Sequence, residues 1–102
     1  VLVLDNGGFA VINKLQNTTG QPGFNNLIAD CPTVPDPFTV DFEAHARALG
    51  AIAETVASPV ELAQAFQRAK AATRTSVIVM RVDAYEGWTT RGHAWWEIGT
   101  AE

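Results

Sequence analysis

The chain has 102 residues, of which 47% are hydrophobic and 18% are charged, and its net charge is -4. This length allows one domain at most, because compact domains usually span about 100 to 150 residues. The composition is that of a folded protein, and disorder is not expected. The basic residues form no run and are outnumbered by acidic ones, so nucleic acid is not expected as a partner.

Cysteine content and hydropathy indicate the compartment. The single cysteine, Cys31, has no second cysteine with which to form an internal disulfide. The sequence shows neither a signal-peptide pattern nor an apolar stretch long enough to span a bilayer. We therefore expect a cytoplasmic protein with no membrane partner.

The first half of the chain contains one strand and a long loop. The apolar run at residues 1–4 predicts a strand buried on both faces, ending in the turn residues 5–8. Because the chain begins inside this strand, without an initiator Met, we expect it to be a piece of a longer protein. Residues 9–16 can form one or two helical turns. Residues 17–40 are rich in proline and glycine, and a loop this long is typically functional or packed on something else.

A short helix is predicted over residues 41–49. Asp41 is its N-cap, and Gly50 is its C-terminal stop. Phe42, Ala46 and Leu49 recur at helical spacing and predict the buried face.

The elements that follow alternate regularly. Residues 51–55 predict a strand. Ser58-Pro59-Val60-Glu61 is a capping box with proline at the first helical position, and it predicts a helix that ends near Thr73. Residues 76–82 predict another strand. The tail 83–102 carries all three tryptophans and has no clear period.

Strands that alternate with helices predict a fold of the α/β class, with a parallel sheet and right-handed crossovers. The expected architecture is a three-stranded parallel sheet with flanking helices. A parallel sheet needs cover on both faces, and the few helices predicted here leave strand edges and apolar surface exposed. Further chain or a partner is therefore expected to complete the sheet.

The turn Asp5-Asn6-Gly7-Gly8 is the first candidate site. It follows a strand at its carboxyl end, where ligands bind in open α/β sheets. An Asn amide oxygen and carbonyls exposed by a Gly-Gly turn suit a hard cation such as Mg²⁺, and glycines allow a diphosphate to approach the backbone. On turn chemistry alone an ordinary turn is the better explanation, so context has to decide.

The remaining candidates favour packing over chemistry. His45 lies between apolar residues of a short helix, which favours a packed histidine over a catalytic base. Packing is also favoured for His93. Cys31 has no partner at metal-ligand spacing, and no serine-hydrolase or Walker pattern occurs. Asn25-Asn26 fits a capping role better than a polyol site.

Two roles are equally consistent with the three tryptophans near the end of the chain. Trp88, Trp95 and Trp96 suit an interface or a lid over a site, and they suit core packing equally well.

Residues 3–10, Val-Leu-Asp-Asn-Gly-Gly-Phe-Ala, resemble the end of the diphosphate-binding motif of thiamine-diphosphate enzymes. That motif opens with Gly-Asp-Gly and closes on Asn-Asn, and here the closing pair is Asp5-Asn6. Further stretches are similar to one branch of the family, the trihydroxycyclohexane-1,2-dione hydrolases of myo-inositol breakdown. These stretches are 13–16, 24–27, 41–50 and 92–97. The resemblance covers essentially the whole chain.

The resemblance implies a part of a cofactor site. In the family, the second Asn of the closing pair gives its side-chain oxygen to Mg²⁺, and the residue two further on gives its main-chain carbonyl. The implied metal ligands are Asn6 and Gly8, and the implied contacts to thiamine diphosphate are Asn6, Gly7, Gly8 and Phe9. Asp5 departs from the motif, so no role is carried over to it. The Gly-Asp-Gly half and the activating Glu of the family are absent, and no catalytic residue is assigned.

The resemblance also implies where the chain lies within a larger enzyme and what its partners are. Residues 1–102 correspond to the C-terminal part of the diphosphate-binding domain, including the Trp-rich tail 83–102. The implied partners are the remainder of the same enzyme, further copies in a homo-oligomer, and a small cyclic diketone that is opened by carbon-carbon bond cleavage. The fragment is expected to be inactive alone. The alternatives are an acetohydroxyacid synthase or decarboxylase type of thiamine enzyme, or a non-catalytic assembly module.

Overall fold

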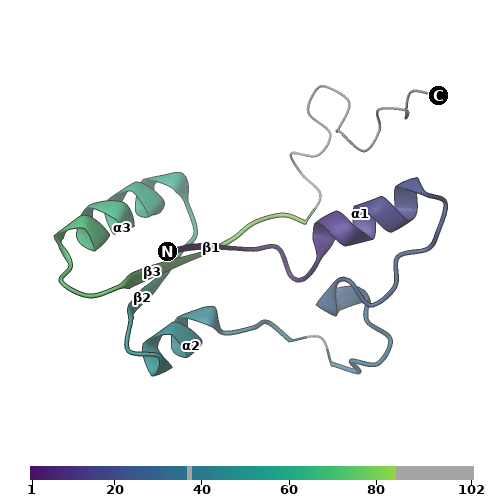
Figure 1. Cartoon of the computed structure of the whole chain (residues 1–102), viewed down its shortest axis with the longest axis horizontal. Helices are drawn as coiled ribbons and strands as arrows, with labels where there is room; N and C mark the ends of the chain where they lie inside the picture. The colour runs from purple at the N-terminus through teal and green to yellow at the C-terminus, as the bar shows by residue number, and fades with distance from the viewer. Residues whose placement is uncertain (37, 85–102) are drawn as a thin grey trace, which may run out of the picture.

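The computed structural model describes residues 1–36 and 38–84. Three helical elements follow one another after the first strand of this range, and strands and helices alternate from there on (Figure 1). In chain order the elements are β1 (Leu2–Asp5), α1 (Ala10–Thr18), the 3-10 helix η1 (Ile28–Asp30), α2 (Phe42–Ala48), β2 (Ile52–Val56), α3 (Pro59–Ala71) and β3 (Ser76–Arg81). No helix in these ranges is both long enough and apolar enough to cross a membrane.

The three strands form one parallel sheet in the order β1-β3-β2. Figure 1 shows α3 on one side of the sheet and α2 on the other, whereas α1 lies beyond the carboxyl end of β1. Ile78 and Val79 are adjacent in the central strand, so their side chains point to opposite faces, and both are buried. Ile78 packs with Val56 and with Ala65 of α3. The predicted fold class is confirmed: a three-stranded parallel sheet with flanking helices.

Side-chain caps begin the two helices that flank the sheet. Asp41 Oδ1 accepts a hydrogen bond from the Ala44 N–H at 2.8 Å. Ser58 Oγ accepts from the Glu61 N–H at 3.2 Å, and Glu61 Oε2 accepts from the Ala57 N–H at 2.7 Å. These bonds satisfy amide groups that the first helical turn leaves unpaired. Both predicted N-caps are confirmed.

The end of α2 follows from Gly50. This residue has a φ of +87°, which glycine adopts without steric penalty. The Gly50 N–H bonds to the Arg47 carbonyl at 2.9 Å, and the Ala51 N–H bonds to the Ala46 carbonyl at 3.1 Å. This pair of bonds is the Schellman arrangement, and it confirms the predicted stop.

The prediction that the first strand is buried on both faces is wrong. Leu2 and Leu4 are 38% and 56% exposed, because β1 lies at the edge of the sheet and the flanking helices of the described ranges pack mainly on β2 and β3. The expected exposure of strand edges and apolar surface is confirmed by the same observation.

The buried face of α2 also differs in part from the prediction. Ala46 is buried, but Leu49 is 78% exposed and His45 is exposed as well. The reason is the length of α2, which ends at Ala48, so the chain turns away before Leu49 can reach the sheet. The packed histidine predicted at position 45 is therefore wrong.

Candidate functional site

The turn after β1 is closed by a side chain. Asp5 Oδ1 accepts a hydrogen bond from the Gly7 N–H at 2.9 Å, which is the Asx-turn arrangement. Asp5 thus holds the turn from within, and this contact gives a structural role to the residue that departs from the family motif.

A second segment braces this turn from the outside. The Phe9 N–H donates to the Asn26 carbonyl at 2.7 Å, and the Ile28 N–H donates to the Gly7 carbonyl at 3.0 Å. Gly8 lies between these bonds, opposite Leu27 in an isolated antiparallel bridge. A Cβ at Gly8 would lie 2.2 Å from the Asn26 carbonyl oxygen, so only glycine allows this approach. The long loop is therefore packed against the turn.

Two oxygen donors of the turn remain available. The carbonyl of Gly8 takes no part in the two bracing bonds, and it accepts no other backbone hydrogen bond within residues 1–36 and 38–84. The Asn6 side chain is half-buried and makes no hydrogen bond to any residue that the structure describes. Asn6 lines two neighbouring pockets of about 240 and 450 Å³. An amide oxygen and a carbonyl oxygen are donors that suit Mg²⁺.

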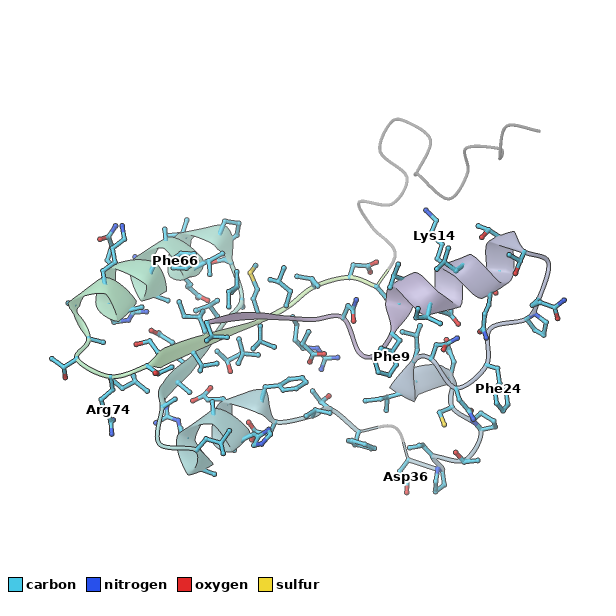
Figure 2. The ribbon with its side chains drawn as sticks, viewed as in Figure 1. Phe9, Lys14, Phe24, Asp36, Phe66 and Arg74 are labelled. Atoms are coloured by element: carbon cyan, nitrogen blue, oxygen red, sulfur yellow. The ribbon has the colours of Figure 1, made fainter. Side chains whose placement is uncertain are left out.

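The N-terminus of α1 opens onto the same turn. Its N-cap, Phe9, makes no side-chain capping bond, and the first turn of the helix carries no acidic residue. Phe9 is 70% exposed and lies at the junction of the turn and α1 (Figure 2). The unpaired amides and the positive end of the helix dipole favour an anion here.

A cation lies at the same edge of the sheet. The register places Asp5 beside Arg81, the last residue of the central strand. Arg81 Nη1 donates to Thr39 Oγ1 at 2.8 Å and lines the larger pocket together with Asn6. Sequence reasoning missed Arg81, although a charge at the end of an apolar strand was the available signal.

The electrostatics of the α2 side are set by Glu43. The Thr55 hydroxyl, donating to Glu43 Oε2 at 2.6 Å, and the Arg47 guanidinium, 2.8 Å from Oε1, lower the pKa of the Glu43 carboxyl. Glu43 and Thr55 line a further pocket with Asp5 and Arg81. A carboxylate whose pKa lies below its ordinary value therefore lies near the turn.

Of the other sequence candidates, Asn26 braces the turn through its backbone carbonyl, and Cys31 interacts with Thr33. Cys31 Sγ lies 3.1 Å from Thr33 Oγ1, and this contact lowers the pKa of the thiol. Within the ranges described, no group of three His, Cys, Asp or Glu side chains could hold a metal ion. His93 and the three tryptophans lie outside the described residues.

Residues 1–80 match the model of the thiamine pyrophosphate enzyme C-terminal TPP binding domain. The chain is 32% identical over 103 residues to the 3D-(3,5/4)-trihydroxycyclohexane-1,2-dione hydrolase of Lacticaseibacillus casei. It is 30% identical over 105 residues to the protein of the same name from Listeria monocytogenes.

These alignments cover 100% of the chain but only 16% of each relative. No solved structure matches significantly. The family model spans most of the chain, including the β1 turn and all three strands up to Met80. The chain therefore belongs to the thiamine pyrophosphate enzymes, and residues 1–80 carry the sequence of their C-terminal TPP binding domain.

Proposed function

We propose that this chain is part of a thiamine-diphosphate- and Mg²⁺-dependent hydrolase that opens a cyclic 1,2-diketone of inositol breakdown by carbon-carbon bond cleavage. The support for the reaction is similarity over the whole chain to relatives that bear that hydrolase name. In this proposal, residues 1–102 are the C-terminal part of the diphosphate-binding domain, and the remaining parts of the site come from the rest of the polypeptide and from a second copy in a cytoplasmic homo-oligomer.

The observation that carries the proposal is the pair of available oxygens in the β1 turn. The Asn6 amide has no hydrogen-bond partner among the described residues, and the Gly8 carbonyl is left out of the bracing bonds. These groups fit Mg²⁺, which prefers oxygen ligands and completes its shell with carboxylate, phosphate or water. We assign Asn6 and Gly8 as metal ligands.

The diphosphate group is assigned to the adjoining backbone. Gly7 and Phe9 flank Gly8, and the open N-terminus of α1 begins directly after them. A diphosphate here would face helix amides and the Mg²⁺ that neutralises its charge. Asn6, Gly7, Gly8 and Phe9 then form this chain's share of the cofactor site.

The chemistry of the reaction is carried by the cofactor. When bound, thiamine diphosphate supplies a nucleophilic carbon and an electron sink for breaking the carbon-carbon bond. The residues of this chain bind and orient, and none of them is assigned a proton transfer. The chain alone is therefore expected to be inactive.

The test is a substrate comparison with the full-length enzyme. The purified protein, loaded with thiamine diphosphate and Mg²⁺, is assayed on the cyclic dione and on pyruvate. Ring opening of the dione, with little turnover of pyruvate, is expected. Turnover of pyruvate alone would assign the protein to the acetohydroxyacid synthase or decarboxylase type. Failure to bind the cofactor at all would favour a non-catalytic assembly role.

A further inference from the structure

Side-chain amides connect α1 to the segment that braces the β1 turn. Asn26 Nδ2 donates to Gln16 Oε1 at 2.5 Å and, in a longer contact, to Asn13 Oδ1 at 3.4 Å. Gln16 Oε1 also accepts from the Phe24 N–H at 3.1 Å. Asn13, Gln16 and Asn26 thus form an amide cluster. Two of its members are on α1, one helical turn apart, and the third is in the long loop.

Asn13 is the most enclosed member of the amide cluster, and Gln16 and Asn26 are half-buried. Asn13 is 7% exposed and is the one buried polar residue in the described part of the chain. A Cβ at Gly23 would lie 2.2 Å from Asn13 Oδ1, so the loop backbone lies directly against this amide. A buried amide that loses its partners is costly, and the cluster therefore favours one arrangement of the loop.

Asn26 connects the amide cluster to the turn. Its side chain bonds to α1, and its backbone carbonyl accepts from the Phe9 N–H at 2.7 Å. The same carbonyl oxygen is the atom closest to a Cβ built on Gly8. A displacement of Asn26 would therefore move Gly8 and its carbonyl.

We propose that Asn13, Gln16 and Asn26 are positioning residues that fix the Asn26 carbonyl and thereby the position of Gly8, whose carbonyl is assigned to the divalent cation. This inference rests on the proposed function, because it takes the turn to be the Mg²⁺ and diphosphate anchor. The amide cluster itself touches neither the metal nor the cofactor. Its expected effect is on the Mg²⁺ dependence of cofactor retention.

The experiment uses Gln16 in the full-length enzyme. Gln16→Met removes the acceptor oxygen at similar size, and Gln16→Glu keeps an acceptor at the same place. The measured quantity is the Mg²⁺ concentration that gives half-maximal retention of thiamine diphosphate in equilibrium dialysis. We expect Gln16→Met to raise it about fivefold, the effect of losing one net hydrogen bond. We expect Gln16→Glu to restore the wild-type value.

Two further variants make the result specific. Gln67→Met is the same substitution at an exposed position of α3, and it should leave the half-saturating Mg²⁺ concentration unchanged. Gly23→Ala pushes against Asn13 Oδ1 and should reproduce the rise independently, including in the event that Gln16→Met does not fold.

The outcomes separate this inference from the proposed function. An unchanged Mg²⁺ requirement in folded Gln16→Met or Gly23→Ala would overturn the positioning role. A lower unfolding temperature of the apoenzyme without a change in Mg²⁺ requirement would also overturn it, since that is the result of a purely structural role. A wild-type enzyme that needs no Mg²⁺ to retain the cofactor would overturn the proposed metal site, and this inference with it.

Discussion

The Cα of Gly8 lies so close to the Asn26 carbonyl that a Cβ at position 8 would be 2.2 Å from the carbonyl oxygen. These residues belong to a strand-to-helix turn and to a loop that returns to it. Their contact, with the Phe9 and Ile28 backbone bonds beside it, joins the two segments into one unit. The candidate cofactor turn is therefore braced by the chain itself.

Replacing Gly8 by Ala tests this contact. The added methyl group must displace backbone, so we expect Gly8→Ala to destabilise the full-length enzyme by about 3 kcal/mol in chemical unfolding. Gly20→Ala is the control, because Gly20 also has a positive φ, +78°, but nothing within 4 Å of the added carbon. The control should cost about 1 kcal/mol. Equal losses in the two variants would argue against the close approach.

The core beneath the central strand gives a second prediction. Ile78 is 2% exposed and packs against Val56 and Ala65, so Ile78→Val should lower the free energy of unfolding by about 1 kcal/mol. Ile52→Val makes the same change on the edge strand β2, where the side chain is 39% exposed, and should have less than about half this effect. The free energies of unfolding of the two variants are compared by urea titration. A larger loss of stability for Ile52→Val than for Ile78→Val would contradict the assignment of the core to Ile78.

A third prediction concerns pH. The pKa of Glu43 is lowered in the folded protein, mainly by the hydrogen bond from the Thr55 hydroxyl and secondly by Arg47. A lowered folded pKa stabilises the protein above the unfolded pKa of about 4.3, and this contribution is lost as the pH falls through the folded value. Thr55→Val should therefore destabilise most at neutral pH, and its difference from wild type should shrink in acid.

The check for this prediction is a series of unfolding midpoints between neutral and acid pH. Thr55→Ser keeps the hydroxyl and serves as the matched control, with a profile parallel to that of wild type. A difference between Thr55→Val and wild type that stays constant across the series would contradict the assigned cause of the pKa shift.

Features that depend on local signals were predictable from the sequence. Asp41 and Ser58 lie immediately before the helices that they cap, and Gly50 lies immediately after α2. Each signal acts over a few residues, and tertiary packing did not override it. The parallel sheet followed from the alternation of these elements.

Features that depend on distant residues were not predictable. Gly8 and Leu27 form a bridge across a loop whose composition indicates no pairing. Arg81 donates to Thr39, which lies 42 residues earlier in the sequence. The exposure of Leu4 depends on the position of β1 at the sheet edge, which an apolar run alone does not reveal. The roles of Asn13 and Gln16 likewise depend on where the loop returns to α1.

The β1 turn is proposed to anchor Mg²⁺ and the diphosphate. The most direct test is calorimetric titration of thiamine diphosphate into metal-stripped full-length enzyme, with and without Mg²⁺. The wild-type enzyme should bind the cofactor tightly only with Mg²⁺. Asn6→Ala should lose at least about tenfold in affinity with the metal present, the loss expected of a removed metal ligand or its support. Asn17→Ala, at an exposed position near the end of α1, should bind as wild type. Mg²⁺-dependent binding by Asn6→Ala equal to that of wild type would contradict the account.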